Sequence, residues 1–154
     1  MKPDPHQDYN AIDLSIVIVN WNVRDLLERC LASVLRPEPA RPDHFTLQVI
    51  VVDNASTDDS VAMLRAEFPQ VQVIANDANR GFAFANNQGI AVARGRYVLL
   101  LNPDTEVLDD ALATLVRYMD AHPDVGIAGP QLLHPDGRIQ SSRRRFPNLP
   151  TLFL

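Results

Sequence analysis

Two carboxylates stand directly after strand-like apolar runs, where a side chain is free to do chemistry. Asp53 ends the run 47–53, and Asp104 follows the run 98–101. A single Asp in such a place is usually a turn residue or a helix cap. Two of them at one edge of a sheet are a stronger signal, because Mg²⁺ and Mn²⁺ are commonly held by one or two carboxylates together with substrate phosphates.

Other polar groups follow neighbouring strands. Asn20-Trp21-Asn22 offers a ring that could stack on a base and amides that could hydrogen-bond its edge, although core packing of Trp21 explains the ring equally well. Arg80-Gly81 precedes a helix, where a cation and free backbone N–H groups could contact a phosphate. A solvated loop arginine is the simpler alternative there.

Helical and strand periodicities predict the elements that carry these residues. Strands are predicted at 14–20, 47–53, 71–75, 96–101 and 125–128, helices at 23–35, 56–68, 82–93 and 109–121, and a hairpin at 132–139. Ser56 to Asp59 has capping-box spacing, and Gly95 fits a helix C-cap. The alternation predicts an α/β fold with a mostly parallel sheet flanked by helices. Ligands bind such sheets beyond the carboxyl ends of the strands.

Composition limits the function classes. The 154 residues suffice for one domain, and the net charge of −5 gives no indication of nucleic-acid binding. The single cysteine, Cys30, excludes an internal disulfide and is expected to be a buried thiol. Residues 1–12 are polar and predict a disordered tail, and the first apolar run is too short for a signal peptide or a membrane span. We therefore expect a cytoplasmic protein.

Three nucleotide-binding classes lack support. The sequence has no GxxxxGK[ST] and no GxGxxG after its first strand, which disfavours a P-loop protein and a dinucleotide-binding fold. A flavodoxin-like or receiver domain is a further alternative. A receiver domain needs a lysine beside its acidic pocket, whereas the only lysine here is Lys2 in the polar tail.

Four segments together are similar to the family 2 glycosyltransferases with the GT-A fold, and most of all to their rhamnosyltransferase-like branch. They read LSIVIVNWN, VIVVDNASTDDS, NRGFAFANNQGIAVARGRYVLLLNPDTEV and GPQLLHPDGRIQSSRRRFP. The similarity covers residues 13 to 147, and the four motifs stand in the family's order and spacing. It implies that residues 13–154 form the nucleotide-sugar-binding part of a GT-A domain whose C-terminal acceptor part is absent.

The resemblance also implies roles for individual residues. Asn20 and Asn22 around Trp21 would cradle the nucleotide, and Asp53 would contact its base. The loop and helix start that line the nucleotide-sugar correspond to Arg80, Gly81, Phe82 and Asn86.

The family's DXD motif, whose last Asp binds the divalent cation that bridges the two phosphates, reads Asn102-Pro103-Asp104 here. Asp104 is thus the expected ligand of Mg²⁺ or Mn²⁺. Asn102 replaces the first carboxylate with an amide, which brings no charge to the metal and could hydrogen-bond a ribose hydroxyl.

The implied reaction is a single inverting displacement from a nucleotide-diphospho-sugar donor onto a glycan or lipid-linked acceptor. The general base that deprotonates the acceptor is expected beyond Leu154, so the chain is expected to bind the donor and to transfer little or nothing alone. Arg138 and Arg143–Arg145 form a basic segment that is either a solvated connector, a phosphate contact or a peripheral contact with the inner face of a membrane. A non-catalytic nucleotide-sugar-binding or regulatory module is the alternative function.

Overall fold

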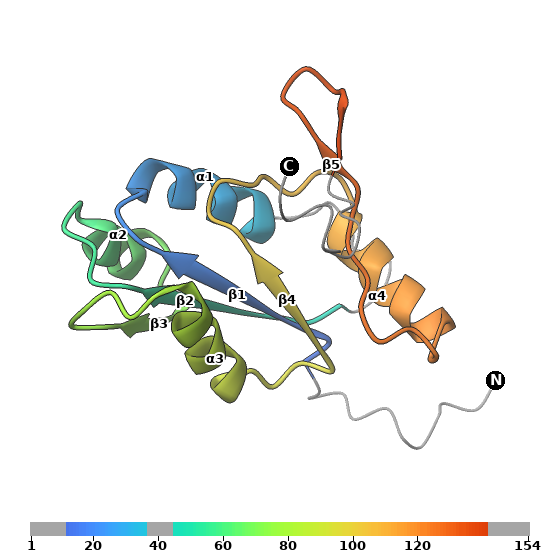
Figure 1. Cartoon of the computed structure of the whole chain (residues 1–154), viewed down its shortest axis with the longest axis horizontal. Coiled ribbons are helices and arrows are strands. Elements are labelled where there is room, and N and C mark those ends of the chain that lie inside the picture. The colour runs from blue at the N-terminus through green and yellow to red at the C-terminus, as the bar shows by residue number, and fades with distance from the viewer. Residues whose placement is uncertain (1–11, 37–44, 142–154) are drawn as a thin grey trace, which may run out of the picture.

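The computed structural model describes residues 12–36 and 45–141, so residues 1–11 of the predicted tail, most of the first long loop and Arg143–Arg145 lie outside the described residues. Strands and helices alternate along the chain (Figure 1). The elements are β1 (Leu14–Asn20), α1 (Arg24–Leu35), β2 (Leu47–Asp53), α2 (Ser60–Glu67), β3 (Gln72–Ala75), α3 (Phe82–Val92), β4 (Tyr97–Leu101), α4 (Ala111–Ala121), β5 (Leu132–Leu133) and β6 (Ile139–Gln140).

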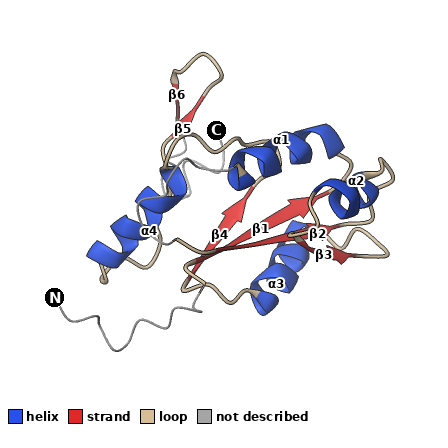
Figure 2. Cartoon of the chain, turned by 180° about the vertical axis from the view of Figure 1, so that it is seen from behind, coloured by secondary structure: helices blue, strands red, loops and turns tan. Residues whose placement is uncertain are grey.

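The main sheet has the strand order β3-β2-β1-β4, and all of its pairings are parallel. The first strand of the chain is therefore a central strand, with β2 on one side and β4 on the other (Figure 2). In the register, Asn20 lies opposite Asp53, and Ile18 lies opposite Leu101. This arrangement confirms the predicted α/β fold with a parallel sheet.

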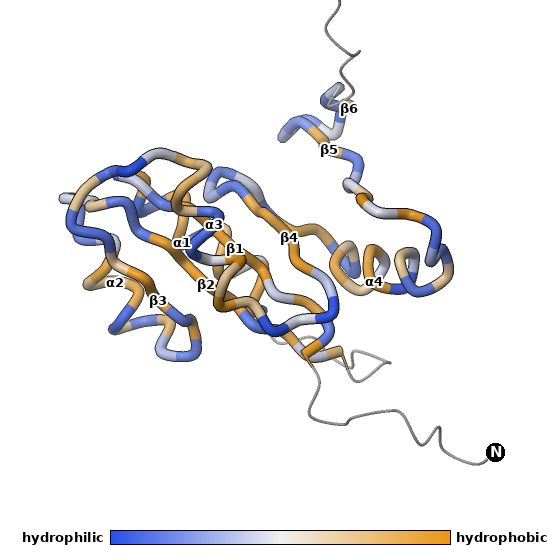
Figure 3. The backbone as a smooth tube through the Cα atoms, turned by 60° about the horizontal axis from the view of Figure 1, so that its bottom comes forward, coloured by the Kyte–Doolittle hydropathy of each residue, from blue (hydrophilic) through white to orange (hydrophobic). Residues whose placement is uncertain are grey.

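Helices cover both faces of the sheet. The alternate side chains Leu14, Ile16 and Ile18 of β1 pack with α1, α2 and α4 in the larger core. Val17 points to the opposite face, where it packs with Ile50 and with α3. Because both faces of β1 and β2 are covered, the middle of each strand is a continuous apolar run, 16–19 and 49–52. The tube in Figure 3 shows how polar and apolar segments are distributed over the fold. The outer strand β4 is less covered, since α3 packs on β1 and β2 and leaves two apolar side chains of β4 exposed, Val98 and Leu100.

Two glycines, one in α3 and one in the segment after it, lie very close to β1. A Cβ atom on Gly89 would lie 2.3 Å from Cγ1 of Val17, and one on Gly95 would lie 2.4 Å from the backbone nitrogen of Ser15. The predicted C-cap at Gly95 is wrong, because α3 ends at Val92 and Ala93 is its C-cap residue. The glycine at 95 is instead required by the backbone of β1 beside it.

The predicted strand 125–128 is absent. Gly126–Ala128 lies beside Tyr97–Leu99 of β4, but a groove of about 310 Å³ separates the two segments, so no strand pairing forms. The predicted hairpin does form, as β5 paired antiparallel with β6, and it projects away from the main sheet (Figure 1). Gly137 takes the left-handed conformation in its turn, with φ = 81°.

The predicted helix start at Ser56 is also wrong, since α2 begins at Ser60. The Ser56 side chain does not cap the helix because it is used elsewhere. Its Oγ accepts hydrogen bonds from Nδ2 of Asn20 and from the backbone N–H of Asn22. These contacts between neighbouring loops outweigh the local capping pattern.

An ionic network ties α4 to the amino edge of the sheet. Arg96 donates hydrogen bonds to Asp13 before β1 and to Asp120 in the last turn of α4, at 2.9 and 2.7 Å. The hydrogen bond from Arg96 lowers the pKa of Asp120. Burial raises the pKa of Asp13, but hydrogen bonds from Thr46 and Arg96 outweigh that effect and leave the pKa below its ordinary value.

We expect Gly89→Ala to lower the free energy of unfolding by about 1–2 kcal/mol, because overpacking against the fully buried Val17 exceeds the helix propensity gained. Urea unfolding followed by circular dichroism measures the change. Gly126→Ala is the matched control, because nothing lies within 4 Å of an added Cβ there, and it should change stability by no more than about 0.5 kcal/mol. Equal effects of the two variants would contradict the close packing of α3.

The Arg96 network predicts a specific acid sensitivity. The pKa values of Asp13 and Asp120 are lowered in the folded state, so their stabilisation is present above the unfolded pKa near 4 and is lost as the pH falls through the folded values. Arg96→Met should therefore flatten the fall in unfolding free energy between about pH 5 and pH 2, as measured by urea unfolding at several pH values. Arg65→Met, on α2, should keep the wild-type slope.

Candidate functional site

The parallel strands bring four polar segments to one edge of the sheet. Residues 20–22, 53–59, 76–81 and 102–106 follow the carboxyl ends of β1, β2, β3 and β4 (Figure 1). The strand order places the ends of β2 and β4 on either side of the end of β1. The residues singled out in the sequence are thus gathered at one edge, with the exception of Asn86, which lies inside α3.

Asn20 and Asp53 form a buried pair at the centre of this edge. Nδ2 of Asn20 donates to Oδ1 of Asp53 at 2.8 Å, and the backbone N–H of Ser56 donates to Oδ2 at 2.8 Å. Both side chains are almost fully buried. Oδ1 of Asn20 has no hydrogen-bond partner among the described residues. The pair therefore holds the loop after β2 in place and leaves one buried acceptor unsatisfied.

The loop after β1 is joined to the loop after β2 by further side-chain contacts. Oδ1 of Asn22 accepts from the backbone N–H of Thr57 at 2.7 Å, and Oδ2 of Asp58 accepts from the backbone N–H of Arg24 at 2.8 Å. Oδ1 of Asp58 also accepts from Ser60. Burial raises the pKa of Asp58, but these hydrogen bonds outweigh it and lower the pKa overall. Asn22 is thus part of a clamp between loops.

Left-handed backbone conformations concentrate in these two loops. Asn22, Ala55 and Asp59 have φ values of 54°, 62° and 63°. This conformation costs an L-residue about 1–2 kcal/mol, less for Asn and Asp than for Ala. The contacts between the loops hold the strained backbone in place.

Three large side chains at the edge are open to solvent. Trp21 is 55% exposed, which rules out core packing as the reason for this residue. Phe82 is 58% exposed at the start of α3, and the Arg80 side chain is 54% exposed. The guanidinium of Arg80 lies 3.5 Å from Asp77 and 5.3 Å from the ring centre of Phe84, so its charge is only weakly engaged. Gly81 joins this arginine to α3 with φ = 86°.

Asn86 is turned toward the protein interior. It is buried on α3, and its Nδ2 donates to the backbone carbonyl of Phe82 at 3.0 Å. Its contact with a nucleotide-sugar stays a prediction, and in this structure its Nδ2 is engaged within α3.

Asn102-Pro103-Asp104 forms a tight turn after β4. The backbone carbonyl of Asn102 accepts from the N–H and the hydroxyl of Thr105, at 3.3 and 2.7 Å. The thiol of Cys30 lies below the turn, 3.7 Å from the same carbonyl, and burial raises its pKa to about 11. Cys30 is a buried thiol, as expected.

Asp104 presents its carboxylate to solvent on this turn. In the described ranges it makes no hydrogen bond or ion pair, whereas nearby Glu106 lies 3.6 Å from Arg29. No group of three or more His, Cys, Asp or Glu side chains gathers as a metal site within residues 12–36 and 45–141. Asp53 ends β2, which is separated from β4 by β1, so the two strand ends are roughly 10 Å apart at the usual strand spacing. Both carboxylate oxygens of Asp53 are already hydrogen-bonded. The residues present fit a cation held by one carboxylate and completed by ligand phosphates and water.

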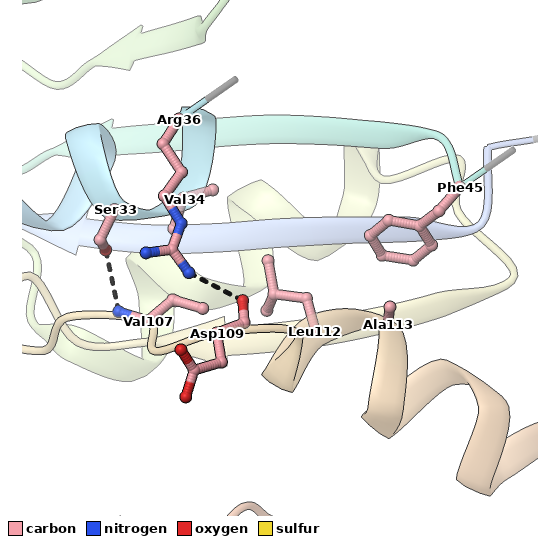
Figure 4. Close-up of a pocket in the computed structure, with 8 residues that line it drawn as sticks. All are labelled: Ser33, Val34, Arg36, Phe45, Val107, Asp109, Leu112 and Ala113. Carbon is pink, nitrogen blue, oxygen red and sulfur yellow. Dashed lines mark hydrogen bonds between the residues drawn. The ribbon is translucent and has the colours of Figure 1, made fainter. Parts of the chain in front are cut away.

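The segment that leads from this turn to α4 is fastened to α1. Oγ of Ser33 accepts from the backbone N–H of Val107 at 2.9 Å, and Arg36 donates to the backbone carbonyl of Asp109 at 2.8 Å (Figure 4). The small cavity in this seam has a volume of about 10 Å³, room for a single water molecule. The seam therefore positions the turn with Asp104 and offers no room for a substrate.

Sequence reasoning missed an amide network on the β3 side of the edge. Asn54, Asn76 and Gln88 are linked by side-chain hydrogen bonds of 2.8 to 3.0 Å. The sequence pattern indicates only a turn at Asn76, and nothing in the helical pattern of 82–93 distinguishes Gln88 from its neighbours. Asp58 and Ser56 were likewise assigned to a helix cap and are loop contacts instead.

Comparison with known proteins identifies the family. The family model for glycosyl transferase family 2 matches residues 15–153. The succinoglycan biosynthesis protein ExoO of Rhizobium meliloti is 36% identical over 110 residues, which are 71% of this chain and 30% of ExoO. The N-acetylglucosaminyl-diphospho-decaprenol L-rhamnosyltransferase of Mycobacterium tuberculosis is 29% identical over 147 residues, 88% of this chain and 46% of the relative.

Solved structures give the same fold. The mannosyltransferase PcManGT of Pyrobaculum calidifontis, in complex with GDP-Man and Mn²⁺, superimposes with a TM-score of 0.61 at 25% identity, covering 71% of this chain and 32% of the other. Residues 1–349 of TarS from S. aureus, in complex with UDP-GlcNAc, give a TM-score of 0.63 at 20% identity, covering 73% and 32%. The fold is GT-A, and the chain spans between 30% and 46% of the length of these relatives and neighbours.

Both the family match and the 36% identical relative cover most of the chain, and three of the four segments that carry the resemblance reach the polar carboxyl edge. The chain belongs to glycosyltransferase family 2.

Proposed function

We propose that this chain is the donor-binding part of an inverting glycosyltransferase, which moves a sugar from a nucleotide-diphosphate donor to a glycan or lipid-linked acceptor. The observation that carries the proposal is the carboxyl edge, where a rigid Asn20–Asp53 pair lies among exposed Trp21, Arg80 and Asp104. These are the groups needed for a base, a diphosphate and a cation.

The nucleotide half of the donor is assigned to the loops after β1 and β2. The exposed indole of Trp21 offers a stacking surface for the base, and the Asn20–Asp53 pair fixes the loop beside it. Asn22 keeps its loop in a fixed shape through Thr57, and within residues 12–36 and 45–141 its Nδ2 has no hydrogen-bond partner. Stacking on an aromatic ring is worth about 1–3 kcal/mol per base in nucleic-acid complexes.

The diphosphate is assigned to the space between Arg80 and Asp104. Arg80 supplies a cation whose present partners are weak, and Phe82 with Gly81 forms the start of α3 beside it. Asp104 would hold Mg²⁺ or Mn²⁺, and Asn102 would hydrogen-bond a ribose hydroxyl. When bound, the cation neutralises the negative charge that develops on the leaving diphosphate.

In the proposed reaction, an acceptor hydroxyl oxygen bonds to the anomeric carbon while the bond from that carbon to the donor phosphate breaks. The nucleoside diphosphate leaves with the bonding electrons, and a general base takes the hydroxyl proton. We place that base beyond Leu154, since Asp109 and Asp110 stand at the start of α4, where Arg117 holds Asp110. Rhamnose is the candidate sugar, supported by the mycobacterial rhamnosyltransferase relative.

The proposed membrane contact involves the basic residues Arg138 and Arg143–Arg145. Arg138 pairs with Asp136 at 2.7 Å in the hairpin, and Arg143–Arg145 lie outside the described residues. None of the helices described has the length and apolar character needed to cross a membrane. We retain contact with the inner face of a membrane as the route to a lipid-linked acceptor, and a vesicle-binding assay with anionic lipid tests it.

A non-catalytic binding module is the second candidate function. It shares the donor site and differs in lacking transfer, so donor binding without turnover in the complete polypeptide would favour it. A titration of the chain with nucleoside diphosphates is the first experiment for both candidate functions.

The single tryptophan provides a direct test of the donor site. Trp21 is the only tryptophan in the chain, so its fluorescence reports on this edge alone. We expect UDP, GDP or dTDP to quench it saturably in the presence of Mn²⁺, and we expect EDTA to weaken the binding. Absence of quenching and of calorimetric heat with all three nucleotides would contradict the proposal.

Asp104→Asn should remove the charge that holds the cation and leave the turn intact. We expect it to weaken Mn²⁺-dependent nucleotide binding about tenfold, equivalent to about 1.4 kcal/mol, and to leave the affinity in EDTA unchanged. Asp124→Asn, in the turn after α4, is the matched control and should behave as wild type. Equal Mn²⁺ dependence in wild type and Asp104→Asn would remove Asp104 from the cation site.

A further inference from the structure

Gln88 makes an unusual contact for a residue in the middle of α3. Its Nε2 donates to Oδ1 of Asn76 at 2.9 Å, and its Oε1 accepts from Nδ2 of Asn76 at 2.8 Å. The two amides thus face one another and satisfy each other reciprocally. The contact joins the helix to the carboxyl end of β3.

Asn76 passes this contact on toward the centre of the edge. Its Nδ2 also donates to Oδ1 of the buried Asn54 at 3.0 Å, and its backbone N–H donates to the carbonyl of Asp53 at 2.9 Å. Nδ2 of Asn54 in turn lies 3.4 Å from the carbonyl of Gly81. The three amides therefore connect α3 to the end of β3 and to the loop after β2. Through Asn54 they also reach Gly81, the residue that precedes α3.

The segment that carries Arg80 is held at both ends by these groups. Asn76 anchors its beginning, and Gly81 anchors its end through the contact with Asn54 and through its N–H, which donates to Oδ1 of Asn79 at 2.9 Å. Among the described residues, Arg80 itself makes only the weak contacts with Asp77 and Phe84. The backbone position of Arg80 therefore depends on the anchors.

Other contacts hold α3 on the sheet independently of Gln88. Gly89 lies directly on Val17, and the backbone N–H of Gly95, just past the helix, donates to Oγ of Ser15 at 2.8 Å. Loss of the Gln88 amide should leave the helix in place and release the segment before it. This separates an ordering role from a general structural role.

From these contacts we propose that Gln88 is a positioning residue, which acts through Asn76 and Asn54 to place Arg80 for the donor diphosphate. The proposal rests on the proposed function for its ligand. The order of residues 77–81 is a property of the free protein and can be tested without any ligand.

The test compares Gln88→Leu, Gln88→Glu and wild type. Hydrogen exchange followed by mass spectrometry or NMR should show that the backbone amides of 77–81 exchange at least tenfold faster in Gln88→Leu, with β1 and β2 unchanged. Gln88→Glu keeps an acceptor for Nδ2 of Asn76 and should be intermediate. Gln72→Leu is the matched control, because Gln72 makes an amide contact with Gln48 at the other end of β3.

Nucleotide titrations with UDP, GDP and dTDP in Mn²⁺ then connect this order to binding. We expect Gln88→Leu to raise Kd about tenfold, Gln88→Glu to restore part of the affinity, and Gln72→Leu to match wild type. Unchanged exchange at 77–81, faster exchange throughout the protein, or equal losses of affinity in Gln88→Leu and Gln72→Leu would each overturn the proposal. Failure of wild type to bind any of the three nucleotides contradicts the proposed function, and the exchange measurement still decides whether Gln88 orders the segment.

Discussion

The candidate site depends on the hydrogen bond between Asn20 and Asp53. A buried carboxylate is costly unless donors surround it, and removing a single donor to a buried charged group is strongly destabilising. Here the donors are the amide of Asn20 and the backbone of Ser56, so two strand ends and one loop meet at one side chain. The loops after β1 and β2 take their shape from this centre, and the clamps of Asn22 and Asp58 extend it outward.

This rigidity separates residues that build the edge from those that face solvent. Asn20, Asp53 and Asn86 are buried and bonded within the protein, whereas Trp21, Phe82 and Asp104 are exposed. The two classes alternate along the chain, from Asn20 and Trp21 after β1 to Phe82 and Asn86 on α3. A short motif such as Asn20-Trp21-Asn22 can therefore combine a structural amide with an exposed ring.

The sequence predicted the parallel α/β fold and the gathering of its polar segments, because periodicity and strand order determine both. It could not predict contacts that bring distant segments together. Ser56 has a local capping pattern, yet Asn20 and Asn22 take its hydroxyl. Gly95 resembles a C-cap, yet the backbone of β1 requires it. Gln88 carries no local signal because its partner Asn76 lies twelve residues away, just after β3.

The central place of β1 in the sheet also bears on how the chain folds. Its pairing with β2 joins residues 33 positions apart, Leu14 and Leu47, whereas its pairing with β4 joins Leu14 to Tyr97. Loop closure is costlier for the longer separation, and parallel pairing over such distances is slow. The β1–β2 unit is thus favoured to form first, and during synthesis on the ribosome one side of β1 waits for β4 with its backbone groups unpaired.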